Sequence, residues 1–345
     1  MDRHEITITV NREAVKERFK KLQEAAPEAT IVPVIKNNAN GLGTLEMYHL
    51  YSEIGAEYVA CSYAREFLRT IPAEDDRLNK ISWIWTPDDE YKKVKNLILV
   101  CKNLPQIDFC ESNKIRYMVC FDIAMNRGGF SPLESGMVNK AVKTDDLYLG
   151  ILTHCPHETF EGTVDYLTAY KELLSRLPDR LVKLQSVANS FVFTNNKNGR
   201  FGLCRIGEAL LLPRTADEFS VNYDPIEVST YIADHKMVYP GKYVGYDAVK
   251  IEVPTKIAIL PVGYYTFEAD VLKKVLVCVG DAKIKCNIIT AMHDTMVIDI
   301  SEIPEKYIQN NKVIIMNLEL REDNWNRCIQ KTFKINKDLA YYKYL

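Results

Sequence analysis

The feature that most constrains the fold of this chain is a repeated alternation of short apolar runs with helical segments. The alternation continues over roughly 200 residues, and each apolar run has the length of a buried strand. This pattern favours βα units and suits a (β/α)8 TIM barrel, whose active-site groups follow the carboxyl ends of the strands. A doubly wound open sheet is the alternative, but the chain has no G-x-G-x-x-G turn. The expected strands are 30–35, 58–61, 81–85, 97–100, 117–121, 148–152 and 184–186.

After residue 228 the sequence changes to β-rich runs with few helical periods, which indicates a separate, mostly β domain. Residues 5–10 (E-I-T-I-T-V) read as a short strand, and Asn11 suits the N-cap of a helix that carries Val15, Phe19 and Leu22. We assign residues 12–230 to the barrel, and residues 1–11 together with 231–345 to the β-rich domain. The expected β runs are 243–253, 255–262, 275–279, 283–289, 295–300 and 312–316.

Composition narrows the class of protein. The chain has 345 residues, a formal net charge of -2 and no basic stripe, so neither nucleic acid nor an anionic membrane is an expected partner. No stretch has the apolar length of a membrane span, and the N-terminal segment lacks the apolar core of a signal peptide. The 9 scattered cysteines form no C-x-x-C pair, which favours reduced thiols in the cytoplasm over disulfides or structural zinc.

Two basic residues follow expected strands. Lys36 comes directly after the apolar run 30–35. Burial there would lower the pKa of its ammonium and make it a good Schiff-base amine, whereas a lysine just past a strand end can also extend into solvent. Arg127 lies in a glycine-rich loop, where its planar guanidinium suits a carboxylate ligand or is simply exposed.

His154 follows the expected strand 148–152, in a position where a histidine is either structural or functional. Cys155 and His157 lie close to it in sequence, which raises the question of a metal site. Pro156 interrupts any helical spacing of ligands and no second ligand cluster is evident, so we expect none.

Segment 34–43 (V-I-K-N-N-A-N-G-L-G) resembles the K-A-N-A-Y-G-H-G signature of the alanine racemase family, whose lysine binds pyridoxal phosphate as a Schiff base. The resemblance implies that Lys36 holds this cofactor. Asn40 stands in place of the tyrosine that usually contacts the phosphate, and Leu42 in place of the histidine.

Segment 122–130 (D-I-A-M-N-R-G-G-F) resembles the family's D-T-G-M-x-R-x-G-F, and T-H-C at 153–155 resembles its T-H-F-A. The resemblance implies that Arg127 holds the substrate carboxylate and that His154 lies beside the cofactor ring. Two residues before Asp122 the family usually has a carbamylated lysine that steadies the arginine. Cys120 stands there in this chain, so Arg127 needs a different support.

A-N-S at 188–190 and L-C-R-I-G at 203–207 resemble the family's A-N-S and V-R-x-G segments. The resemblance implies that Ser190 and the backbone at Gly207 and Glu208 cradle the phosphate, as amides that open a helix can do. Arg205 would face the pyridine nitrogen and, since a guanidinium accepts no proton, keep it unprotonated and the cofactor a weaker electron sink. Tyr341 corresponds to a family tyrosine near the phosphate.

Three segments of the β-rich part resemble family blocks. Residues 240–248 resemble G-x-x-V-G-Y-G, residues 260–264 resemble the start of P-I-G-Y-A-D-G, and residues 293–299 resemble M-D-x-x-x-x-D. The resemblance implies that Tyr246 is a catalytic base, that Tyr264 lines the entrance, and that His293 and Asp294 lie near the substrate. Y-T-F at 265–267 replaces A-D-G, and His293 stands where methionine is usual. These departures predict a preference for an amino acid other than alanine, or a broad range.

The resemblance therefore implies an amino-acid racemase that interconverts the L and D forms of a small amino acid (alanine, serine or a broader range) with pyridoxal 5'-phosphate. Lys36 and Tyr246 would be the bases on opposite faces. An unperturbed tyrosine has a pKa near ~10, so a hydrogen-bonded chain from Tyr246 through His154 to Arg205 would be needed to favour the phenolate. The expected assembly is a homodimer with shared active sites, in which the partner's β-rich domain supplies Tyr246.

Other functions of the same fold stay open. A D-amino-acid aldolase or dehydratase would need metal ligands in the β-rich domain, where His293 and Asp294 are the suggestive pair. A related decarboxylase is longer and has a Cys-Asp motif near its end, which this chain lacks. A non-enzymatic pyridoxal-phosphate-binding protein consists of the barrel alone, without a domain that carries Tyr246.

Overall fold

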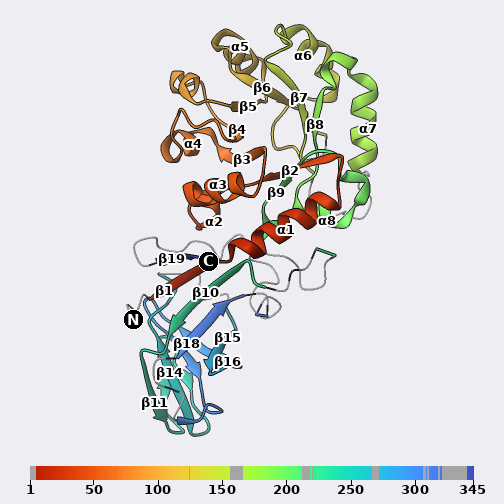
Figure 1. Cartoon of the computed structure of the whole chain (residues 1–345). Helices are drawn as coiled ribbons and strands as arrows, with labels where there is room; N and C mark the ends of the chain where they lie inside the picture. Colours follow the sequence, from red (N-terminus) through yellow and green to blue (C-terminus); the bar gives the residue numbers. More distant parts are fainter. Residues whose placement is uncertain are drawn as a thin grey trace.

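The computed structural model describes residues 5–123, 125–155, 166–211, 218–219, 221, 223–265, 272–305, 308, 311–317, 319–320 and 340–345. Figure 1 shows two parts, a ring of strands surrounded by helices and a β-rich domain in which both chain ends lie. Within the described ranges, no helix has the length and apolar character needed to span a bilayer.

Eight parallel strands form a closed barrel, which confirms the predicted fold class. Strands β3 to β8 make one continuous parallel sheet, and β2 pairs in parallel with β9. Two bridges close the ring, Val34 with Ala60 and Asn189 with Arg205. The barrel strands are β2 (Ala29–Pro33), β3 (Tyr58–Tyr63), β4 (Asn79–Ile84), β5 (Leu97–Cys101), β6 (Arg116–Cys120), β7 (Tyr148–Leu152), β8 (Leu184–Ser186) and β9 (Gly202–Ile206).

Helices follow the barrel strands and cover the outside of the ring. In α1 (Arg12–Glu24) the Asn11 side chain accepts a hydrogen bond from the Ala14 amide at 3.0 Å, and Val15, Phe19 and Leu22 are buried on one face, as predicted. The other helices are α2 (Lys36–Asn40), α3 (Thr44–Glu53), α4 (Ala64–Thr70), α5 (Leu104–Asn113), α6 (Ser135–Ala141), α7 (Tyr166–Arg176), α8 (Ser190–Asn195) and α9 (Glu208–Leu211), with 3-10 turns η1 (Asp89–Lys93), η2 (Pro132–Glu134), η3 (Asp179–Leu181) and η4 (Lys197–Gly199).

The barrel interior is a packed core. All residues of β5 are buried. Ile98 and Val100 belong to the inner cluster, with Met118 and Leu203 of neighbouring strands, whereas Leu99 packs into the larger core between the strands and the helices. Because the interior is filled, a ligand can be bound only at an end of the barrel, and in this fold that end is the one at the strand carboxyl termini.

The β-rich domain is built on a 9-stranded sheet in the order β11-β14-β17-β16-β15-β18-β10-β1-β19. The N-terminal strand β1 lies between β10, to which it is antiparallel, and β19, to which it is parallel, so the first strand of the chain belongs to this sheet. The strands are β1 (Ile6–Val10), β10 (Ile226–Tyr231), β11 (Asp234–Val238), β14 (Thr255–Leu260), β15 (Lys274–Val279), β16 (Ala282–Ala291), β17 (Met296–Asp299), β18 (Lys312–Met316) and β19 (Ala340–Tyr344).

The β-rich run expected at 243–253 is interrupted by a turn. The segment forms a separate hairpin of β12 (Tyr243–Val244) and β13 (Val249–Lys250), joined by a turn that holds Tyr246. Gly245 has φ 69°, and a Cβ there would lie 2.4 Å from a methyl carbon of Thr290, so glycine is needed both for the turn and for the close approach. The turn presents Tyr246 to solvent.

Candidate active site

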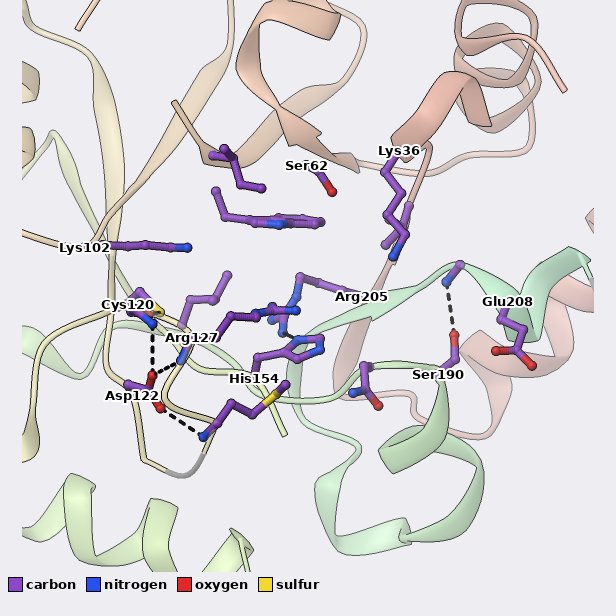
Figure 2. A pocket seen from close by; sticks show the side chains of 18 of the residues that line it. Lys36, Ser62, Lys102, Cys120, Asp122, Arg127, His154, Ser190, Arg205 and Glu208 are labelled. Carbon is purple, nitrogen blue, oxygen red and sulfur yellow. Dashed lines mark hydrogen bonds between the residues drawn. The ribbon is translucent and has the colours of Figure 1, made fainter. Parts of the chain in front are cut away.

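A pocket of about 520 Å³ opens at the carboxyl ends of the barrel strands (Figure 2). Each of the eight barrel strands, or the residues that follow it directly, contributes to its wall. Its size suits a small-molecule ligand. One end holds Ser190 and Glu208, the opposite end Lys102 and Asp122, with Lys36 on the wall nearer Ser190.

Lys36 lines the pocket where the chain leaves β2. The backbone before it is fixed on both sides, because the Val34 amide donates to the Ile206 carbonyl at 3.0 Å and the Ile35 amide to the Ala60 carbonyl at 2.8 Å. Burial, reinforced by the nearby charge of Arg127, lowers the pKa of the Lys36 ammonium. A larger share of the side chain is therefore the neutral amine, which is the nucleophilic form.

The four residues after Lys36 form a left-handed turn. Their φ values are 57°, 55°, 50° and 56° at Asn37, Asn38, Ala39 and Asn40. A left-handed conformation costs about 1–2 kcal/mol for an ordinary L-residue and is best tolerated by glycine and asparagine. Three of the four residues are asparagine, which reduces this cost, and the chain then continues through Gly41 at φ 92°.

Glu66 holds this turn from helix α4. Its carboxylate accepts hydrogen bonds from the Asn38 amide at 2.7 Å, from the Thr44 hydroxyl at 3.0 Å and from the Cys61 thiol at 2.9 Å. From the other side, the Tyr344 hydroxyl donates to the Leu42 carbonyl at 2.5 Å. These contacts offset the backbone cost and fix the position from which Lys36 projects.

Arg205 lies at the floor of the pocket, in β9, and is 4% exposed. One guanidinium nitrogen donates to the Thr153 carbonyl at 2.8 Å and lies 3.2 Å from His154 Nδ1, and another donates to the Ser186 hydroxyl. Burial lowers the pKa of Arg205 to about 10, which still leaves it charged at neutral pH. Since a guanidinium only donates, His154 Nδ1 is the acceptor, and a neutral imidazole then carries its proton on Nε2.

Ser190 gathers backbone donors at one end of the pocket. Its hydroxyl oxygen accepts from the Gly207 amide at 3.1 Å and from the Ala209 amide at 3.3 Å. Gly207 lies between β9 and α9, and Ala209 is in the first turn of α9. The hydroxyl and these two amides form a group of donors suited to an anion. Glu208 lines the same end. Its carboxylate would repel an anionic group, so only its backbone amide would suit one.

Asp122 supports Arg127 at the other end. Its carboxylate accepts from the backbone amides of Met125 at 3.0 Å, Asn126 at 3.0 Å, Arg127 at 2.6 Å and Gly128 at 3.1 Å. This capping fixes the loop that carries the guanidinium. The support that the sequence leaves unexplained at Arg127 thus comes from its own loop.

Cys120 cannot provide a charge to Arg127. Burial raises the pKa of its thiol to about 11, so the thiol is neutral near pH 7. Its Sγ lies 3.7 Å from the Gly128 carbonyl oxygen and directs the proton there. A Cβ on Gly129 would lie 2.9 Å from the Cys120 carbonyl oxygen and 3.1 Å from its Sγ, so the loop packs tightly against this residue.

The predicted residues of the β-rich domain form a second group, outside the pocket, which we call the tyrosine patch: Tyr246, Tyr264, Tyr265, His293 and Asp294. Tyr265 stacks on His293 at 4.9 Å between ring centroids, and Tyr264 meets the same ring edge-on at 5.5 Å. His293 Nδ1 contacts the Asp294 carboxylate. Tyr246 is 78% exposed, and no residue of the patch lines the pocket of the same chain.

The loop of Tyr246 lies next to this cluster. Asp247 accepts a hydrogen bond from the Thr290 hydroxyl at 2.9 Å, and Thr290 is three residues before His293. The structure therefore brings the predicted residues together in two places. Lys36, Arg127, His154, Ser190, Arg205, Gly207 and Glu208 line the pocket, and the β-domain residues form the exposed patch.

Tyr341 lies in neither place. It is on β19, paired with Thr7 of β1 and 47% exposed, and it does not line the pocket of the same chain, so its place near the phosphate stays a prediction. The tyrosine that reaches the loop after Lys36 is Tyr344. Two sets of residues from the sequence analysis lie outside the described ranges. They are residues 156 and 157, considered for a metal site, and residues 266 and 267, which replace family residues.

The sequence interpretation missed Glu66 and Lys102. Lys102 follows β5 directly and lines the pocket, so the argument that singled out Lys36 after its apolar run applies equally to it. Glu66 had no comparable signal, because it lies on a helix and reaches the turn at Asn38 only through the fold.

Comparisons with known proteins identify related chains of the same family. The family model described as alanine racemase, N-terminal domain, matches residues 10–214. The alanine racemase of Fusobacterium nucleatum is 25% identical over 336 residues, which cover 92% of this chain and 93% of that protein.

Solved structures show the same fold over the whole chain. The alanine racemase from D-cycloserine-producing Streptomyces lavendulae has a TM-score of 0.84 at 19% identity, covering 100% of this chain and 98% of its own. The alanine racemase from Bartonella henselae, described with covalently bound pyridoxal phosphate, has a TM-score of 0.77 at 18% identity and covers 99% of each chain.

Proposed function

Because this chain belongs to the alanine racemase family of pyridoxal-phosphate-dependent isomerases, we propose that it interconverts the L and D forms of an amino acid with Lys36 and Tyr246 as its two bases. The observation that carries the proposal is the meeting of Lys36, Arg127 and Arg205 with an anion-suited group of donors in one pocket. The family model alone covers more than half of the chain, and the pocket lies within the matched residues.

The residues present fit pyridoxal phosphate. Lys36 offers an amine of lowered pKa to an aldehyde, Ser190 and the amides of Gly207 and Ala209 offer donors to a phosphate, and Arg205 lines the same pocket. When bound, the cofactor supplies an electron sink that acidifies the α-proton of an amino acid. Arg205 would donate a hydrogen bond to the ring nitrogen and, as a permanent donor, keep it unprotonated.

Arg127 and Lys36 would act on the substrate from the barrel side. Arg127 would hold the α-carboxylate, because its loop is fixed by Asp122 and no hydrogen bond or ion pair within the described residues engages its guanidinium. Lys36 would exchange a proton with the α-carbon on its own face of the substrate. Its lowered pKa brings the amine closer to the range in which a general base is effective.

Tyr246 would serve the opposite face, with help from His154. The contact with Arg205 makes His154 Nδ1 an acceptor, so the imidazole proton lies on Nε2 and can be donated to a phenolate oxygen. A phenolate stabilised in this way is a stronger base near neutral pH than an exposed tyrosine. The Arg205–His154 contact is thus the half of the proposed Tyr246–His154–Arg205 chain that one subunit provides.

The proposed assembly is a homodimer with shared sites. The pocket of this chain is lined only by barrel residues, and the exposed tyrosine patch of the same chain does not line it. A two-fold contact would let the patch of each subunit cover the pocket of the other and exclude water from it. Tyr246, Tyr264, His293 and Asp294 would then act in trans.

Chiral chromatography tests the function directly. The purified protein, supplemented with pyridoxal phosphate, is incubated with single L-amino acids, including alanine, serine and lysine. We expect the D-enantiomer to appear and the approach to a racemic mixture to stop in Lys36→Ala. Release of ammonia, an aldehyde or carbon dioxide without any D-enantiomer would instead indicate a dehydratase, aldolase or decarboxylase of the same fold.

A further inference from the structure

The end of the pocket that holds Arg127 carries a second cation. Lys102 follows β5, and its side chain points into the pocket (Figure 2). The Gln106 side chain accepts a hydrogen bond from the Lys102 amide at 2.7 Å, which fixes the backbone from which the side chain projects. Its Cδ lies 3.6 Å from the place that a Cβ on Gly128 would occupy, beside the loop of Arg127.

Among the described residues, no carboxylate pairs with either of these two cations. Within the part of the chain that the structure describes, no hydrogen bond or ion pair engages the Lys102 ammonium or the Arg127 guanidinium. The Asp122 carboxylate is committed to four backbone amides of its own loop, and the Cys120 thiol is neutral. Lys102 is partly buried and Arg127 is exposed at the pocket mouth, and two neighbouring cations repel each other, so this end of the pocket is suited to a ligand with two negative groups.

We propose that Lys102 recognises a second acidic group on the substrate, and that the preferred substrates are amino dicarboxylic acids, aspartate or glutamate. The inference rests on the proposed racemase function. Arg127 takes the α-carboxylate, and Lys102, from the neighbouring strand, takes the carboxylate of the side chain. Alanine leaves the Lys102 ammonium unpaired, whereas a dicarboxylate gains a charged hydrogen bond.

The first test measures binding without turnover. Isothermal titration calorimetry on the cofactor-loaded protein compares succinate and glutarate with propionate, which has one carboxylate. We expect at least one dicarboxylate to bind tenfold or more tightly than propionate, and Lys102→Met to remove the difference. Lys140→Met, which deletes an exposed lysine on α6, is the matched control and keeps it. Equal affinities in the wild type, or an equal loss for propionate and the dicarboxylates in Lys102→Met, would overturn the proposal.

The second test measures selectivity in turnover. We expect kcat/KM for aspartate or glutamate to exceed that for alanine, and the ratio to fall at least tenfold in Lys102→Met. If alanine is racemised but no dicarboxylate is preferred in either experiment, the inference fails and the racemase function stands. If dicarboxylates bind preferentially through Lys102 but no amino acid is racemised, the proposed function fails and the recognition site stands.

Discussion

The barrel and the β-rich domain each carry a cluster of the residues that the sequence singles out, but the two clusters differ in environment. The barrel cluster is concave, with Arg205 buried at its floor and Lys36 lowered in pKa by burial. The tyrosine patch is exposed to solvent, with Tyr246 78% exposed and the Asp294 side chain 78% exposed. Only the first is a pocket that a small molecule can enter.

This difference indicates a division of roles. Burial prepares the barrel residues within a single chain, because desolvation and the neighbouring charges already act on Lys36 and Arg205. The patch residues lack such an environment in one chain, so their chemistry depends on what covers them. In the proposed homodimer, each chain would therefore contain two halves of a site, and halves from different subunits would meet.

The largest loss of activity is expected from a substitution in the barrel cluster. Lys36→Ala removes the amine that would bind the cofactor and one of the bases, so racemisation should fall by roughly 10³-fold or more. Mass spectrometry after borohydride reduction should show the added mass of the reduced cofactor on the wild type and not on Lys36→Ala. The control Lys140→Ala should keep both the adduct and the activity. An adduct of equal yield on Lys36→Ala would show that another lysine holds the cofactor.

A substitution in the tyrosine patch should slow α-proton exchange mainly for one enantiomer. Tyr246→Phe removes the base of one face only, so α-proton exchange from one enantiomer should fall by about 10²–10⁴-fold and from the other far less. NMR of each pure enantiomer in deuterated water measures the two rates separately. Tyr243→Phe is a matched control, because Tyr243 is 64% exposed on the adjacent strand β12. Equal losses for both enantiomers would contradict a two-base arrangement.

A third substitution tests how much the hydrogen bonds of Glu66 stabilise the turn after Lys36. Glu66→Ala removes the acceptor of three hydrogen bonds around the left-handed turn, so it should reduce the free energy of unfolding by about 1–3 kcal/mol. Denaturant unfolding of the cofactor-free protein measures this loss. Glu28→Ala, at an exposed position, should leave the unfolding midpoint in place. A wild-type midpoint for Glu66→Ala would show that the turn needs no clamp.

The smallest effect is the pH dependence of stability due to Lys36. Burial lowers the pKa of Lys36 in the folded state below its ordinary value of 10.5, so the unfolded state binds more protons and folding is penalised by the buried ammonium. The penalty is complete below the folded pKa and disappears as pH rises to the unfolded value. Lys36→Met should therefore be more stable than the wild type near pH 7, with a difference that narrows towards pH 10.5.

The same denaturant curves at pH 7 and pH 10 measure this difference in cofactor-free protein. Lys140→Met removes an exposed lysine and should show no such narrowing. If the difference in the free energy of unfolding between Lys36→Met and the wild type is the same at both pH values, burial does not destabilise the Lys36 ammonium.

Much of the barrel could be predicted from the sequence. The apolar runs at 97–100 and 148–152 correspond closely to β5 and β7, because a strand buried on both faces needs a continuous apolar run. Lys36 and His154 follow such runs directly, and strand ends in a barrel meet at one mouth, so their convergence was predictable.

Other features depend on contacts that a local pattern does not contain. The β-rich run at 243–253 gave no position for the turn at Gly245, where a Cβ would lie 2.4 Å from a methyl carbon of Thr290. The clamp by Glu66 joins residues that are 28 apart in sequence. A tyrosine in a β-rich segment can equally pack inside a sheet, so the exposure of Tyr246, Tyr264 and Tyr265 is visible only once the sheet is formed.

The central claim, that the two halves of the site come from different subunits, is tested most directly by mixing two inactive variants. Lys36→Ala has an intact patch and Tyr246→Phe an intact pocket. After subunit exchange, a mixed dimer combines both lesions in one site and leaves the other site whole, so statistical mixing should restore about a quarter of the wild-type activity. If labelled subunits demonstrably exchange and no activity returns, each site is built within a single chain and the account is wrong.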